Sequence, residues 1–278
     1  ENLIPCLDSG PTTIRIIDRK ASKPPKCFLD SEQDVVDWIL EPLNDAEREL
    51  FTSVKSVEGE HNKAQHKSFD CSIMDLADDI AFGVHDLEDA LTLELIDEVD
   101  FRAVVPEERC ASFLTALKEK YPDETGNNVY ETFIDKLYRG GRLRKRYISR
   151  MVHHLITNCR IREDEGFNEP LVRFRAYLAD TPKNFLSALK DVVRKRVILD
   201  PSVQQLEFKG QRMVVAVFEA LSSEPDSFLP RETYQRWQDA DDKPRVICDH
   251  IAGMTDSFLL KTYDRLFSPR MGSVFDRI

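Results

Sequence analysis

The chain has 278 residues, of which 41% are hydrophobic, and its formal net charge is −11 at pH 7. This length suits one large domain or two small ones, and the negative charge argues against a protein that coats nucleic acid. No apolar run approaches the roughly 18 residues that a membrane-spanning helix needs. The six cysteines show no CxxC spacing, so we expect reduced thiols and a cytoplasmic location.

The first 67 residues are expected to be a lead-in of irregular sequence and short helices. Residues 1–30 contain Pro, Lys and Thr without helical periodicity. Capping residues and acidic first turns predict one helix over about 31–40 and another over about 45–57. We assign residues 1–67 to this lead-in and 68–278 to the main helical region, within a single domain.

The next segment carries an unusual concentration of negative charge. Between Lys67 and Arg102 there are thirty-four residues without Lys or Arg, and eleven of them are carboxylates. Apolar residues recur at helical spacing, which predicts one long helix to roughly Val99. Carboxylates three or four positions apart repel each other on a helix. Positive charge must come from outside the segment, as a divalent metal with a bound nucleotide or as a basic patch elsewhere in the fold.

Helical spacing divides this acidic helix into two sides. At 100° per residue, one side carries Asp75, Asp78, Phe82, Asp86 and Asp89 within about 80°. The opposite side should be apolar and consists of Ile73, Ala77, Ile80, Val84, Leu87 and Leu91. A solvated acidic side of an ordinary amphipathic helix explains this spacing. The position of Phe82 within the acidic side, with Gly83 next to it, instead favours close approach by a ligand or another backbone.

The rest of the chain is predicted to be helical almost throughout. Breaks at proline and glycine delimit helices over 107–120, 127–138, 143–160, 182–197, 203–222, 231–238 and 244–267. The alternating segment 171–177 is compatible with a short strand. Only ten glycines and no sustained alternation elsewhere argue against a sheet-based fold. The predicted fold class is therefore all-α, a multi-helix bundle.

Residues 139–150 are the main basic counterweight to the acidic helix. Three interpretations stay open: ion pairs with the acidic helix or a neighbouring subunit, an anion site for nucleotide phosphates, and single-stranded nucleic acid with Tyr147 stacking. A second basic cluster includes Lys190, and the sequence does not tell whether the two clusters meet. The candidate anion contacts are Arg142, Arg144, Lys145 and Arg146.

The histidines offer one alternative metal site. His85 and Asp86 form an HD dipeptide, and His61 and His66 lie upstream in a polar stretch. A local site built from these histidines is conceivable, but solvent-exposed or packing roles are more typical of such positions. Adjacent helix residues point about 100° apart, so in the His153–His154 pair we expect one ring packed and the other exposed.

The run from Ser72 to Asp89 resembles the fourth metal-ligand helix of the deoxyguanosinetriphosphate triphosphohydrolase family. That family belongs to the HD-domain metal-dependent phosphohydrolases. The family's pattern is a ligand Asp, an aromatic residue four positions later and a second Asp four positions after that. Asp78, Phe82 and Asp86 match these places. The likeness extends to residues 23–32, 245–256, 266–269 and 272–275.

This resemblance implies a helical HD-domain fold, incomplete at its N-terminal side, and metal-dependent hydrolysis of deoxynucleoside triphosphates such as dGTP to deoxynucleoside and triphosphate. Asp78 would be a ligand of Mn²⁺, Mg²⁺ or Fe²⁺. Phe82 would pack on the deoxyribose and Asp86 would accept the 3′-hydroxyl hydrogen bond. Phe82 replaces the family's usual Tyr, so a phenolic hydrogen bond is lost. Family members also tend to form symmetric homo-oligomers.

Other parts of the family pattern are missing. The further metal ligands (a His and a His-Asp pair) and the catalytic His and Glu are expected upstream and do not occur. The best match to the family's Lys-Tyr-Pro motif, at residues 3–5, lacks the Lys, and Lys120–Pro122 lies in the wrong order. We interpret the chain as the C-terminal part of a longer enzyme, with no catalytic residue of its own. The alternative is a non-catalytic helical module that binds nucleotides or partner subunits.

Overall fold

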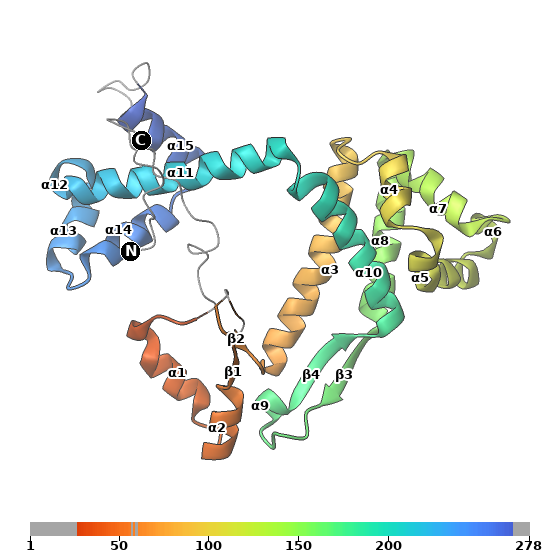
Figure 1. The fold of residues 1–278 in the computed structure, drawn as a ribbon, viewed down its shortest axis with the longest axis horizontal. Helices are drawn as coiled ribbons and strands as arrows, with labels where there is room; N and C mark the ends of the chain where they lie inside the picture. The colour runs from red at the N-terminus through yellow and green to blue at the C-terminus, as the bar shows by residue number, and fades with distance from the viewer. Residues whose placement is uncertain (1–26, 57, 59–60, 269–278) are drawn as a thin grey trace. The chain divides into compact units, whose positions relative to one another are not determined.

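The computed structural model describes residues 27–56, 58 and 61–268. These residues are mostly α-helical with two small antiparallel hairpins (Figure 1), which confirms the all-α prediction. They fall into two compact units that divide between Asp200 and Pro201. Residues 23–26, Pro269 and 272–275, on which part of the resemblance rests, lie outside the described residues, as does the incomplete motif match at 3–5. The assignment of 1–67 as a lead-in within one domain stays a prediction.

The lead-in contains short helices and a two-stranded hairpin. Asn44 starts the second helix, because its side chain accepts a hydrogen bond from the Glu47 backbone N–H at 3.0 Å. The buried Glu47 carboxylate accepts in turn from the backbone N–H of Asn168 at 2.6 Å, which joins this helix to a distant loop. The elements are η1 (Asp30–Glu32), α1 (Gln33–Leu40), α2 (Asp45–Phe51), β1 (Val54–Lys55) and β2 (Lys63–Ala64).

The main body of the first unit is a helical cluster around α3. Its elements are α3 (Phe69–Thr92), α4 (Glu98–Val104), α5 (Glu107–Lys120), α6 (Pro122–Thr125), α7 (Val129–Tyr138), α8 (Gly141–Thr157), β3 (Cys159–Glu163), α9 (Pro170–Arg173), β4 (Phe174–Leu178), α10 (Asp180–Val193) and η2 (Arg194–Ile198). Helix α3 packs against α8 and α10, and α5 packs against α7 and α10. Fully buried aromatic rings fill the centre, where Phe113 stacks on Phe185 with ring centroids 5.0 Å apart. Burial of this apolar surface is the main stabilising contribution to the fold.

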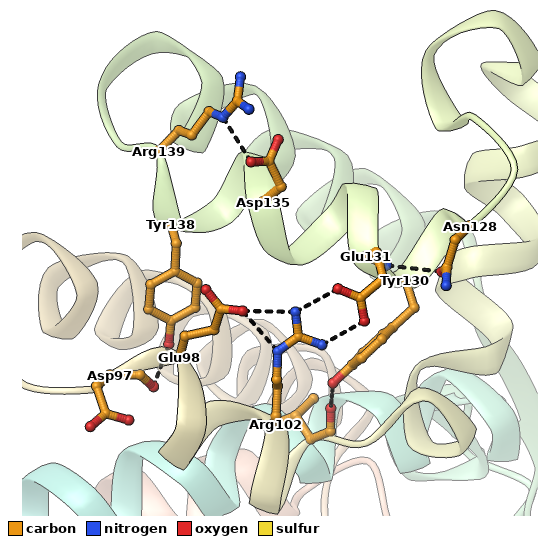
Figure 2. A network of polar contacts seen from close by, with 10 residues as sticks. Asp97, Glu98, Arg102, Asn128, Tyr130, Glu131, Asp135, Tyr138 and Arg139 are labelled. Carbon is orange, nitrogen blue, oxygen red and sulfur yellow. Dashed lines mark hydrogen bonds and ion pairs between the residues drawn. The ribbon is translucent and has the colours of Figure 1, made fainter.

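A polar network attaches α4 to α7 on the outside of this core (Figure 2). The Arg102 guanidinium donates to both oxygens of Glu131 at 2.8 and 2.7 Å and also pairs with Glu98. The Tyr138 hydroxyl donates to the backbone oxygen of Asp97 at 2.8 Å. Such a bidentate Arg–carboxylate pair fixes orientation as well as contact, so the network sets how the two helices meet.

The hairpin of β3 and β4 corrects two sequence predictions. The helix predicted over 143–160 ends at Thr157, because Cys159 already pairs with Leu178 in the antiparallel sheet. The strand predicted over 171–177 begins only at Phe174, after the short helix α9. The hairpin is joined to α3 by Ser72, whose buried Oγ accepts from the Ala176 backbone N–H at 2.8 Å.

The second unit is a smaller helical group with its own core. Its helices are α11 (Pro201–Ser223), α12 (Pro225–Phe228), α13 (Arg231–Asp239), α14 (Lys243–Ala252) and α15 (Asp256–Phe267). Val217, Leu221 and Ile247 are buried in it. The single helix predicted over 244–267 is wrong, because the Thr255 side chain accepts from the Phe258 N–H at 3.3 Å and starts a new helix. Among the described helices, none has the length and apolar composition of a membrane span.

Candidate functional site

Helix α3 carries the candidate site, and its ends are fixed by local signals. Ser68 caps its start, with Oγ accepting from the Cys71 N–H at 3.2 Å. The helix stops at Thr92 instead of the predicted Val99, since Glu94 adopts a left-handed φ of 57°. Asp97 then caps α4 by accepting from the Asp100 N–H at 2.7 Å. The predicted acidic helix is thus two helices with a turn between them.

One side of α3 is apolar and buried, as predicted for most of its length. Val84 and Leu87 are fully buried among α8 and α10. The prediction fails in the first turns, where Ile73 is 44% exposed and Ala77 is also exposed. In these turns β4 contacts α3 through Ser72. Ile73, the next residue of the helix, points about 100° away from Ser72 and therefore away from this contact.

Gly83 allows the close approach that its position predicted. A Cβ at this position would overlap the Leu186 side chain and would lie 3.2 Å from Cγ of Lys190. Helix α10 packs against α3 at this point and is therefore the neighbour that requires a residue without a side chain at position 83.

The acidic side of α3 receives positive charge from other segments at two positions. Lys67 pairs with Asp75, and Lys190 of α10 pairs with Asp79. The Lys190 ammonium also lies 5.7 Å from the ring centroid of the half-buried Phe82, within cation–π range. The sequence did not identify Lys190 as part of this side.

The remaining carboxylates of this side are exposed and lack a basic partner. Among the residues that the structure describes, no basic side chain forms an ion pair with Asp78, Asp86 or Asp89. Partial desolvation is the main cause that raises the pKa of Asp86, and the Asp89 carboxylate raises it further. His85 lowers this pKa by a smaller amount, and Asp78 raises it by the least. Uncompensated negative charge is therefore concentrated around Asp78 and Asp86.

The four candidate anion contacts of α8 have different surroundings. Arg144 donates to the Leu137 carbonyl at 2.9 Å and to Thr92 Oγ1 at 3.2 Å, at the end of α3. Arg146 pairs with Glu124 at 2.6 Å. Arg142 and Lys145 are exposed. Arg144 and Arg146 thus have local partners, and an anion role for all four residues stays a prediction.

The histidines do not assemble into a separate metal site. His66 lies 3.5 Å from Asp164, and His85 faces Glu88 on its own helix at 3.9 Å. Within residues 27–56, 58 and 61–268, no group of three His, Cys, Asp or Glu side chains is placed to hold a metal ion. In the His153–His154 pair, His154 is buried and His153 is exposed, as predicted.

The exposed carboxylates on α3 suit a hard divalent cation, because oxygen ligands are preferred by Mg²⁺ and Mn²⁺. Asp78 fits the role of one such ligand, since its side chain is exposed and has no described cation beside it. A single carboxylate does not make a closed coordination shell. A metal site at this side of α3 would therefore need further ligands that approach Asp78 from elsewhere.

Comparisons with known proteins agree with the resemblance. Residues 178–265 match the model of the phosphohydrolase-associated domain. A deoxyguanosinetriphosphate triphosphohydrolase-like protein of Shewanella woodyi is 39% identical over 259 residues, which cover 91% of this chain and 56% of that protein. A protein with the same description from Shewanella sediminis is 38% identical over 258 residues, with the same coverage. The chain thus spans about half the length of these curated relatives, and the predicted resemblance is confirmed.

Proposed function

We propose that this chain, a homologue of the deoxyguanosinetriphosphate triphosphohydrolase-like proteins, supplies one side of a metal-dependent active site that hydrolyses deoxynucleoside triphosphates to deoxynucleoside and triphosphate. Asp78 is the metal ligand in this proposal, and Phe82 and Asp86 contact the sugar. A Mn²⁺, Mg²⁺ or Fe²⁺ ion held in part by Asp78 would supply Lewis-acid chemistry toward a phosphoryl oxygen and water. The remaining ligands and the catalytic acid and base come from the part of the enzyme that this chain does not span.

The observation that carries the proposal is the surroundings of Asp78, Phe82 and Asp86 on α3. Asp78 and Asp86 are exposed, and Phe82 between them is half-buried and packs in part against the core. The two carboxylates have no basic partner among the described residues. The adjacent Asp79, by contrast, is neutralised by Lys190. Unpaired carboxylates at the spacing of the family motif are what a shared metal and a sugar hydroxyl would need.

The roles of Phe82 and Asp86 follow from their chemistry. The Phe82 ring presents an apolar surface on which a deoxyribose can pack, and a 2′-hydroxyl placed against it would lose its hydration without gaining a partner. The carboxylate oxygens of Asp86 can accept a hydrogen bond from a 3′-hydroxyl. We propose deoxynucleotides as substrates on this basis, in a homo-oligomer as in the family.

The alternative is a helical module that binds nucleotides or partner subunits without chemistry. The absence of a three-residue metal cluster from the described residues favours it for the chain taken alone. Both proposals expect this polypeptide to be inactive by itself.

The test compares this polypeptide with one that adds the natural sequence upstream of Glu1. Both are incubated with dGTP and Mn²⁺, and triphosphate release is measured by ion-exchange chromatography. We expect release only from the longer protein. An inactive longer protein, or a source gene without an upstream segment that carries the His and His-Asp motifs, would favour the module.

A further inference from the structure

A groove of about 800 Å³ lies on the first unit, on other elements than the acidic side of α3. It is formed by α5 along most of its length, the second half of α8 and the first turn of α10. Asp78, Phe82 and Asp86 are not among the residues that line it. A volume of this size accommodates a small molecule of nucleotide dimensions.

A buried arginine lies at this groove. Arg150 is only 8% exposed, and its guanidinium carbon stacks 3.6 Å from the ring centroid of Tyr121. Its Nη2 donates to Glu124 at 2.7 Å, whereas its buried Nη1 has no hydrogen-bond partner among the described residues. An unpaired buried donor on a charged group costs free energy, which an acceptor would recover once the side chains that cover Nη1 move aside.

Further donors surround the same groove. The Lys120 ammonium lies 3.1 Å from Nε2 of His153 and 5.8 Å from the Tyr121 ring centroid. The buried His154 has its Nε2 3.3 Å from Ser112 Oγ. Helix α10 starts here at Asp180 without a side-chain cap, so the N–H of Thr181 is not taken by a capping side chain. Helix N-termini with free N–H groups favour anions.

The acidic residues of the groove lie at its exposed edge. Glu108 and Glu119 line it and are exposed, whereas Arg150 and His154 are buried. Arg109, also in the lining, is neutralised by Asp191 at 2.9 Å. The donors left for an anion are therefore Arg150 Nη1, which has no hydrogen-bond partner among the described residues, the Lys120 ammonium, which is hydrogen-bonded there only to the neutral partner His153, and the start of α10, where Asp180 is the one carboxylate of the first turn.

We propose that this groove binds a phosphate-bearing small molecule, with the phosphoryl group between Arg150, Lys120 and the first turn of α10. Guanidinium and ammonium groups form their strongest hydrogen bonds with such anions. The ligand is either free phosphate or the phosphate of a larger molecule such as a nucleotide, for which the groove has room. This site is independent of the metal and of the proposed triphosphohydrolase activity.

The test is calorimetric titration of the chain, in EDTA, with inorganic phosphate and with a deoxynucleoside 5′-monophosphate. We expect saturable binding of both, and tighter binding of the nucleotide would identify it as the source of the phosphoryl group. Equal affinity for the two would identify free phosphate. Lys120→Met removes one charge-assisted hydrogen bond and should weaken binding by about tenfold or more.

Lys118→Met is the matched control, since Lys118 is exposed on the same helix and does not line the groove. The Lys118→Met chain should bind phosphate and the nucleotide with the same affinities as the unmodified chain. Arg150→Met should abolish binding, with circular dichroism checking its fold. Because Lys120 is exposed, the Lys120 variant keeps the test valid if the Arg150 variant unfolds. No saturable binding, or equal affinity in the Lys120→Met and unmodified chains, overturns the proposal.

Discussion

The two sides of helix α3 differ in the groups that surround them. On one side Val84 and Leu87 are fully buried where α3 packs against α8 and α10, so elements of this chain supply the contacts of these residues. The opposite side leaves Asp78 and Asp86 exposed without a basic partner among the described residues. Packing on the first side positions the carboxylates on the second. The comparison teaches that one helix can complete the core on one side while its other side keeps exposed carboxylates for the proposed site.

The largest expected effect is on the buried side. Leu87→Ala removes a fully buried side chain and should lower the free energy of unfolding by about 2–5 kcal/mol. Asp89→Ala, two positions along on the exposed side, should change it by less than about 0.5 kcal/mol. Urea denaturation followed by circular dichroism measures both. Equal effects of the two changes would contradict the division of α3 into two sides.

The contact of α10 with Gly83 predicts a smaller loss. Gly83→Ala places a Cβ against Leu186 and Lys190, and such overpacking costs about 1–3 kcal/mol. The gain in helix propensity offsets roughly 1 kcal/mol of it, so a net loss of about 1 kcal/mol is expected in thermal or urea unfolding.

Gly210→Ala in α11 is the matched control for the Gly83 variant. Nothing lies within 4 Å of a Cβ at Gly210, so only the propensity gain of up to about 1 kcal/mol remains and the second unit should become more stable. If both variants shifted stability in the same direction, the close approach of α10 would not be what requires Gly83.

The ion pair of Lys190 with Asp79 should have a modest effect. Lys190→Met should destabilise the first unit by about 0.5–1 kcal/mol, because the pair is partly exposed and solvent screens it. A double-mutant cycle with Asp79→Asn isolates the coupling between the two side chains. Lys195→Met, at an exposed position in η2, is the control without effect. A coupling of zero would mean that Lys190 does not neutralise Asp79.

The smallest effect concerns the pH dependence at Asp86. Its raised pKa means that the folded state binds this proton more tightly than the unfolded state. The contribution to stability is present below the unfolded pKa of about 4 and is lost as pH rises through the folded pKa. Asp86→Asn should therefore raise the melting temperature at pH 7 by roughly 1 °C, after allowing for solvent screening, and by less near pH 4. A larger rise at pH 4 would contradict the direction of the shift.

Much of the fold could be predicted from local sequence signals. Residues 107–120 were predicted as a helix with the bounds that α5 has, because Pro106 and Pro122 delimit it. The start of α15 was missed although Thr255 is a typical capping residue. The strand β3 was missed because its pairing with β4 depends on tertiary contacts, which a local pattern does not contain.

The candidate site, too, could be predicted from the sequence only in part. The spacing of Asp78, Phe82 and Asp86 is local, so the sequence could place them on one side of a helix. The role of Lys190 was not predictable, since it lies 111 positions from Asp79 along the chain. The exposure of Ile73 was also missed, because periodicity shows which residues share a side and not which neighbours cover it.

The most direct test compares two adjacent carboxylates of α3 in the longer protein that carries the upstream segment. Metal-dependent triphosphate release from dGTP is measured for Asp78→Ala and for Asp79→Ala. We predict that the Asp78 variant loses activity by a factor of about 10³ or more, since the proposed metal ligand is removed. The Asp79 variant should retain most of it, because that carboxylate is paired with Lys190. Unchanged turnover in the Asp78 variant would contradict the account.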